Sequence, residues 1–317
     1  ELARLIGVCT ATGKVRMRRF LPSLIAVLAS FPLVCAVASE LPISRGERGH
    51  PLVEVALNGQ GPFTMILDTA AGLTTVTTGV KDELGLILLG RSPQPMQLAS
   101  GAEPIDLYTL GFVTLGGRPA PAPITVVLDE PLRHVKPARG ILGMNVLSNF
   151  SVDIDQPNKR LSLSESGTPP PAGFDWHAVP IDRRYDDFII VDVDIGGVAA
   201  KAVIDTGANG SVINDKLAAA LNIVEGAPGV REGQILAGGG ATLKGKAGPL
   251  VLARAQWEEV TLQATQLPLF AALEIDEGPA LILGNDVLDD VRLFIDYANG
   301  KFYLTLPPAS GLIGARQ

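Results

Sequence analysis

Two aspartates with nearly identical surroundings are the residues of this chain best suited to chemistry. One lies in the segment 67–71 (Leu-Asp-Thr-Ala-Ala) as Asp68, and the other lies in 204–208 (Ile-Asp-Thr-Gly-Ala) as Asp205. A single such segment favours no chemistry, because an Asp in a turn often hydrogen-bonds its own backbone. Two copies, each preceded by an apolar residue, favour carboxylates at the rims of two cores. If the two acids lie about 3 Å apart they share one proton, so one can act as a base towards water while the other donates a proton.

The chain repeats itself around these two aspartates. An alternating apolar run, a turn and a second apolar run precede each of them, which predicts hairpins over 51–67 and 188–204. An Ile-Leu-Gly tripeptide follows each aspartate, at 141–143 and at 282–284, and the Asp-to-Gly spacing is 75 and 79 residues. Short helices are predicted near 80–86 and 214–221. This agreement along the whole unit indicates a duplicated unit.

The paired motifs resemble those of the two-lobed aspartic peptidases of the pepsin and retropepsin type. The resemblance covers most of the chain after residue 38. Ala71 and Ala208, which follow Asp-Thr-Ala and Asp-Thr-Gly, resemble the retropepsin form more than the pepsin form. It implies an all-β fold of two pseudo-symmetric lobes, each a six-stranded type of β-barrel, with a few short helices. It also implies that the chain is an aspartic endopeptidase, a hydrolase that acts on peptide bonds.

The resemblance assigns a role to each residue of the motif. Asp68 and Asp205 would be the catalytic pair, and Thr69 and Thr206 would hydrogen-bond across the lobe interface. Gly207 would let the backbone approach the carboxylates closely.

Ala70 departs from the family pattern, which has Gly at this position. Its backbone N–H is retained, but its methyl group costs on the order of 1–2 kcal/mol if the site requires a positive φ or very close packing. This departure leaves an alternative open, a non-catalytic protein that binds peptides or partners with a degenerate protease fold. A third reading is a structural envelope protein that uses the fold as a scaffold.

Two segments that each carry glycines in a turn between strands are candidates for flaps over a substrate cleft. The first spans 96–110 around Ser100 and Gly101, and the second spans 234–244 around Gly238, Gly239 and Gly240. Tyr108 follows the first turn and is interpreted as an ordinary strand residue.

Neither a metal nor a cofactor is expected. The three histidines lack the spacing of zinc ligands. The pairs Asp153/Asp155 and Asp192/Asp194 fit strands with their acids on the wet face better than a calcium site. Both cysteines, Cys9 and Cys35, precede residue 39, so thiol and disulfide chemistry are not expected in the rest of the chain.

Residues 1–38 have the pattern of a signal peptide or an N-terminal anchor. Basic residues between 14 and 19 precede an apolar stretch over 20–38, which ends in a small-x-small cleavage motif at 36–38. With Met17 as the initiator, residues 1–16 would not be translated. The remaining chain divides into lobes over 40–165 and 175–306, a Pro-rich linker over 166–174 and a tail over 307–317. The protein is therefore expected to be exported, either periplasmic or secreted, and to be bacterial.

The charge of the chain limits its partners. Without residues 1–38 the chain has 21 basic and 32 acidic residues, a net charge of −11. This charge disfavours binding to nucleic acid or to anionic membranes. A polypeptide substrate and a monomer are expected, with no stable membrane contact unless the leader stays uncleaved.

Overall fold

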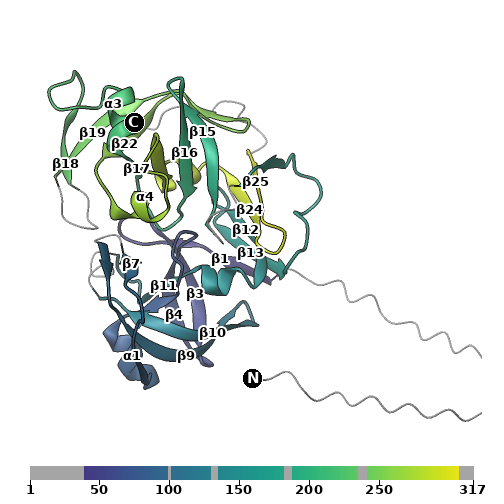
Figure 1. Ribbon diagram of the computed structural model, residues 1–317. Helices are drawn as coiled ribbons and strands as arrows, with labels where there is room; N and C mark the ends of the chain where they lie inside the picture. Colours follow the sequence, from purple (N-terminus) through teal and green to yellow (C-terminus); the bar gives the residue numbers. More distant parts are fainter. Residues whose placement is uncertain (1–38, 99–100, 130–134, 182–187, 235–240, 307–317) are drawn as a thin grey trace, which may run out of the picture. The chain divides into compact units, whose positions relative to one another are not determined.

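The computed structural model describes residues 39–98, 101–129, 135–181, 188–234 and 241–306 (Figure 1). Strands dominate these residues and the helices are short, which confirms the expected all-β class with two repeats. The predicted leader, the tail and the flap residues Ser100, Gly238, Gly239 and Gly240 lie outside the described ranges. No helix among the described residues has the length and apolar character needed to cross a membrane.

The N-terminal lobe contains a closed barrel of six strands. Their order around the barrel is β3 (Pro51–Leu57), β4 (Gln60–Leu67), β11 (Gly140–Leu142), β5 (Thr75–Val76), β10 (Arg118–Val127) and β9 (Asp106–Leu115). The barrel closes because β9 also pairs with β3. β2 (Ser44–Arg45) and β6 (Leu88–Arg91) extend this sheet, while β7 (Met96–Leu98) and β8 (Gly101–Glu103) form a separate hairpin. The helices of this lobe are α1 (Thr78–Leu84) and α2 (Met144–Leu147).

The C-terminal lobe, teal to yellow-green in Figure 1, is built on a nine-stranded sheet. Its strand order is β18 (Arg231–Gln234), β19 (Ala241–Ala247), β22 (Val260–Ala264), β17 (Ser211–Ile213), β23 (Ala280–Leu283), β16 (Val198–Ile204), β15 (Ile190–Ile195), β20 (Leu250–Leu252) and β21 (Ala255–Trp257). Its helices are α3 (Asp215–Ala220), α4 (Pro268–Ala272) and α5 (Asn285–Leu288). Asn214 caps α3 as its sequence predicts, since its side chain accepts a hydrogen bond from the N–H of Leu217.

A third sheet joins the two copies. Its order is β1 (Ser39–Pro42), β13 (Arg160–Glu165), β12 (Phe150–Asp155), β24 (Arg292–Asp296), β25 (Lys301–Thr305) and β14 (His177–Val179). β12 of the first copy pairs antiparallel with β24 of the second copy, so backbone hydrogen bonds connect the lobes directly. One cluster of buried apolar side chains includes residues of both lobes and of this joining sheet.

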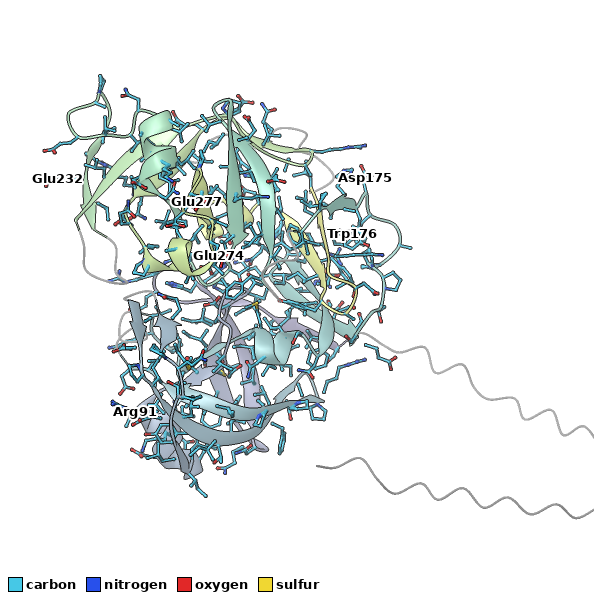
Figure 2. All side chains as sticks on the ribbon, viewed as in Figure 1. Arg91, Asp175, Trp176, Glu232, Glu274 and Glu277 are labelled. Carbon is cyan, nitrogen blue, oxygen red and sulfur yellow. The ribbon has the colours of Figure 1, made fainter. Side chains whose placement is uncertain are left out.

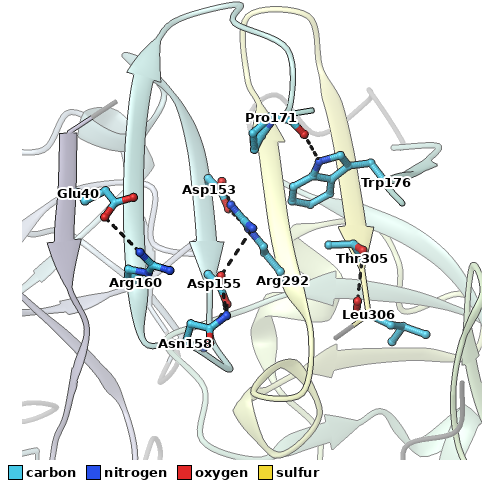
Figure 3. A network of polar contacts seen from close by, with 10 residues as sticks. All are labelled: Glu40, Asp153, Asp155, Asn158, Arg160, Pro171, Trp176, Arg292, Thr305 and Leu306. Carbon is cyan, nitrogen blue, oxygen red and sulfur yellow. Dashed lines mark hydrogen bonds and ion pairs between the residues drawn. The ribbon is translucent and has the colours of Figure 1, made fainter. Parts of the chain in front are cut away.

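The joining sheet contains an ion-pair cluster that the sequence did not predict (Figure 3). Arg292 lies 2.6 Å from Asp153 and 3.6 Å from Asp155, and the two acids are only 4% and 6% exposed. The expectation that this pair lies on a wet strand face is therefore wrong. Burial raises the pKa of Asp153, and Arg292 acts in the opposite direction by stabilising the charged form. Arg292 thus neutralises acids that would otherwise be costly to bury.

Two aromatic residues at the end of the linker, Phe174 and Trp176, cover the same arginine. The guanidinium of Arg292 lies 4.1 Å from the ring centre of Phe174 and 5.4 Å from that of Trp176. Trp176, labelled beside Asp175 in Figure 2, donates its indole N–H to the carbonyl oxygen of Pro171 at 2.8 Å. These cation–π contacts hold the end of the linker against the sheet that joins the lobes.

Candidate active site

Two strands with equivalent places in the repeat deliver the two aspartates. Asp68 follows β4 and Asp205 follows β16, and each of these strands pairs in parallel with the strand that carries Ile-Leu-Gly, β11 or β23. The N–H of Asp68 donates to Leu142 and that of Asp205 donates to Leu283, both at 3.1 Å. Each aspartate is therefore in register with the glycine of the neighbouring Ile-Leu-Gly tripeptide, Asp68 with Gly143 and Asp205 with Gly284.

That glycine allows the chain to pass close behind each loop. A Cβ on Gly143 would lie 2.6 Å from the carbonyl oxygen of Ala71, and a Cβ on Gly284 would lie 2.9 Å from that of Ala208. Both separations are shorter than van der Waals contact. The glycine of each Ile-Leu-Gly tripeptide is thus required by the close packing beneath the loops.

Two threonines tie the loops of the two lobes together by reciprocal hydrogen bonds. The hydroxyl of Thr69 donates to the carbonyl oxygen of Ile204, and that of Thr206 donates to Leu67, both at 2.8 Å. Each hydroxyl also accepts the backbone N–H of the other threonine at 3.1 Å. Both threonines are fully buried. Since Leu67 and Ile204 directly precede the aspartates, these four bonds fix the positions of both carboxyl groups.

The two carboxyl groups meet between the loops. The side chains of Asp68 and Asp205 hydrogen-bond with each other, so the structure brings the predicted pair together. Backbone amides hold the Oδ1 atom of each: Ala70 donates to Asp68 at 2.8 Å, and Gly207 donates to Asp205 at 2.8 Å. Each loop therefore presents its carboxyl group to the other lobe in the same orientation.

The environment raises the pKa of both acids. Burial is the main cause of the raised pKa of Asp68, and the N–H groups of Ala70 and Ala71 oppose it. Burial raises the pKa of Asp205 well above its usual range, and the negative charge of Asp68 adds to this shift. Two acids in contact cannot both ionise easily, so the pair holds one proton over a range of pH and titrates as a unit.

Ala70, which stands where the second copy has Gly207, does not disturb the first loop. Neither Ala70 nor Gly207 has a positive φ, and the Ala70 N–H still donates to Asp68. The methyl group of Ala70 packs against an apolar cluster of the C-terminal lobe. By contrast, a Cβ on Gly207 would overlap the carboxylate of Asp68. The two positions are related by the repeat, yet only the second requires glycine.

Sequence reasoning missed the residues that brace each loop from below. Thr74 donates its hydroxyl and its N–H to Asn145, at 2.9 and 2.7 Å, and accepts the N–H of Gly143. In the second copy, Ser211 bonds in the same way to Asp286, at 2.7 and 3.0 Å. Thr74 and Ser211 each lie six residues after an aspartate, and their partners each lie two residues after the glycine of Ile-Leu-Gly. Aligning the two copies residue by residue could have found both pairs.

One of the two flap candidates can be described in part. Gly101 begins β8, and the β7–β8 hairpin packs against α4 of the C-terminal lobe. The hairpin therefore contacts both lobes. Tyr108 lies on β9 opposite Leu88 of β6, as an ordinary strand residue. In the second candidate, β18 and β19 form the flanking strands, and the glycines themselves lie outside the described residues.

Apolar side chains lie beside the loops that carry the two aspartates. A cluster that includes Ile190, Val212 and Phe270 is buried in the C-terminal lobe, and Ala70 and Ala208 pack against it. The partly exposed side chains of Phe188, Leu267 and Leu269 also pack against this cluster. For metals, no group of three or more potential side-chain ligands occurs among the described residues.

The comparisons with known proteins agree with this geometry. A family model described as aspartyl protease matches the chain twice, over 53–146 and over 191–287, which together make up more than half of its length. Each match contains one of the two aspartates and one Ile-Leu-Gly tripeptide. No curated protein matches the sequence.

Replacing Thr206 with Val tests whether the reciprocal hydrogen bonds hold the lobes together. The variant has nearly the same shape but leaves the buried oxygen of Leu67 and the buried N–H of Thr69 without partners. We expect the free energy of unfolding, measured by urea denaturation, to fall by about 2–3 kcal/mol. Thr64→Val is the matched control, because that hydroxyl bonds Glu54 at an exposed position. Equal stability of the two variants would contradict a role for Thr206.

Proposed function

Because this chain belongs to the aspartyl protease family, we propose that it is an aspartic endopeptidase, which hydrolyses peptide bonds with a water molecule activated between Asp68 and Asp205. The observation that carries this proposal is the contact of the two carboxyl groups, each held by backbone amides. A shared proton gives such a pair a base and an acid at the same time.

The difference between the two acids supports a division of roles. We assign the shared proton to Asp205, whose pKa is raised by burial and by the charge of Asp68, and the role of base to ionised Asp68. Asp68 takes a proton from water as the water oxygen bonds to the peptide carbon, while Asp205 gives its proton to the carbonyl oxygen. When the C–N bond then breaks, Asp68 passes its proton to the leaving nitrogen, and Asp205 recovers a proton from the carbon-bound hydroxyl. The reaction requires no covalent intermediate and no cofactor.

The surroundings of the pair support a polypeptide substrate. The β7–β8 hairpin and α4 come from different lobes and contact each other, and Leu267 and Leu269 offer apolar surface close to the loops. Such a site suits an extended peptide with apolar side chains next to the bond that is cleaved.

The alternative of a non-catalytic binding protein rested on Ala70. Neither the backbone conformation of Ala70 nor its hydrogen bond to Asp68 favours that alternative over catalysis. It remains an outcome of the test below.

Asp68→Asn and Asp205→Asn should each abolish hydrolysis of an unstructured protein, because each leaves only one group able to exchange protons. In the wild type, activity measured from about pH 3 to 7 should rise as Asp68 ionises and fall as Asp205 loses the shared proton. The raised pKa of Asp205 moves this fall towards higher pH. Asp215→Asn, on the first turn of α3, is the control and should keep full activity. Binding of a statine-type transition-state analogue without hydrolysis would favour the binding protein instead.

Exchanging the two residues that follow the threonines tests the asymmetry of the loops. Gly207→Ala forces a methyl group into the carboxylate of Asp68, and we expect kcat/KM to fall by about 100-fold or more. Ala70→Gly only removes a methyl group from an apolar contact and should keep kcat/KM within about threefold. Peptide hydrolysis by the two purified variants measures both effects. A fully active Gly207→Ala variant would contradict the packing described for this loop.

We further propose that the protein is exported. The support comes from the basic residues, apolar stretch and cleavage motif within 1–38. N-terminal sequencing of the protein recovered from the periplasm or the medium should start at Ser39. A chain that retains its leader in the membrane fraction would contradict cleavage and favour an anchor.

A further inference from the structure

Asn285 is a buried polar residue with no counterpart in the first lobe. It is 4% exposed and directly follows Gly284, at the position that Met144 occupies after Gly143. Its side-chain amide donates to the carbonyl oxygens of Thr206 at 2.7 Å and of Ala208 at 2.9 Å. Met144 cannot donate such bonds, so among the described residues only the second loop has its backbone carbonyls held by a side-chain amide at this position.

The bond to Thr206 acts on Asp205 through a single peptide group. The carbonyl of Thr206 and the N–H of Gly207 belong to the same peptide unit, and that N–H donates to Asp205 at 2.8 Å. A donor on the carbonyl oxygen polarises the peptide and strengthens the hydrogen bond that its N–H makes. Asn285 therefore influences both the orientation of the peptide and how strongly it stabilises ionised Asp205.

Two further side chains set the direction of the Asn285 amide. Gln156, 2% exposed, donates to the oxygen of Asn285 at 3.2 Å and accepts from Arg45 at 2.9 Å. Arg45 can only donate, and the carbonyl oxygen of Thr206 can only accept. The side-chain amides of Gln156 and Asn285 therefore each accept with their oxygen on the Arg45 side and donate with their NH₂ group towards Thr206. Arg45 itself is held by Asp289 at 2.7 Å and by the carbonyl oxygen of Gly49 at 2.9 Å.

This hydrogen-bonded series also crosses between the lobes. Arg45 lies on β2 and Gln156 directly follows β12, both in the first copy, whereas Asn285 begins α5 in the second. We propose that Arg45, Gln156 and Asn285 form a positioning relay, by which the N-terminal lobe orients the peptide that holds Asp205. Their effect on catalysis rests on the proposed function, whereas their effect on the ionisation of Asp205 does not.

The charged groups around the relay stay the same in the variants that test it. Asp68 is the titratable group that acts directly on Asp205. Asp286, bonded to Ser211, and Asp289, paired with Arg45, lie close to the relay on the segment after Gly284. A change in the titration of Asp205 in an Asn285 variant would therefore come from the hydrogen bonds rather than from a new charge.

Asn285→Met places the residue of the first lobe into the second and tests the relay. Loss of the amide weakens the Gly207 N–H bond to ionised Asp205, so the pKa of Asp205 should rise by roughly half a unit, followed by carboxyl ¹³C NMR titration. In peptide hydrolysis, the fall of activity on the basic side should move to higher pH by the same amount. We also expect kcat to fall about tenfold, with KM changed less than about twofold.

Gln156→Leu provides a second variant that leaves Asn285 in place. It removes the group that orients the Asn285 amide, and we expect a smaller shift of the Asp205 titration in the same direction. Met144→Leu is the matched control from the first lobe and should leave the titration unchanged. If folded Asn285→Met and Gln156→Leu proteins titrate as the wild type does, the relay is overturned. Absence of hydrolysis by the wild type would overturn the proposed function, and the NMR titration would still decide on the relay.

Discussion

The reciprocal hydrogen bonds between Thr69 and Thr206 are the constraint on which the site depends. Two carboxyl groups in contact repel each other when ionised and lose hydration when buried, so they separate unless the surrounding structure holds them. Each threonine hydroxyl donates to the residue that precedes the aspartate of the other lobe, Ile204 or Leu67. A movement of one loop therefore breaks bonds in both lobes, and the two carboxyl groups are held as a unit.

The sheet that joins the lobes provides the second level of this restraint. β12 and β24 hydrogen-bond along their length and carry Asp153 and Arg292, whose buried ion pair lies beside the aromatic residues at the end of the linker. Breaking such a pair leaves an unpaired buried charge, which is strongly unfavourable. The lobes are thus joined by a sheet with little freedom to slide, and four hydrogen bonds between the loops complete the alignment.

Local patterns predicted much of this structure. Alternating apolar residues and turn residues predicted the β3–β4 and β15–β16 hairpins, and duplication predicted two aspartates at equivalent strand ends. The joining sheet was not predicted, because pairing between strands of different repeats leaves no periodic signal. The same limit explains the error at Asp153 and Asp155: strand alternation places them on a wet face, but Arg292 arrives from a strand about 140 residues later and compensates their burial. The bracing pairs Thr74–Asn145 and Ser211–Asp286 were predictable in principle, since they occupy equivalent positions in the two copies.

Duplication within one chain allows the two halves of the site to differ. A symmetric pair of identical chains would carry the same residue after each glycine and after each threonine, and both aspartates would have the same environment. Here Met144 of the first copy and Asn285 of the second occupy equivalent positions, and so do Ala70 and Gly207. The differences fall on the second loop: Gly207 lies against Asp68, and Asn285 holds the Gly207 peptide. Burial and the charge of Asp68 raise the pKa of Asp205, whereas the Gly207 N–H, polarised by Asn285, acts against this shift. Because the two loops differ in the groups that hold them, substitutions in one loop need not have the same effect as the equivalent substitutions in the other.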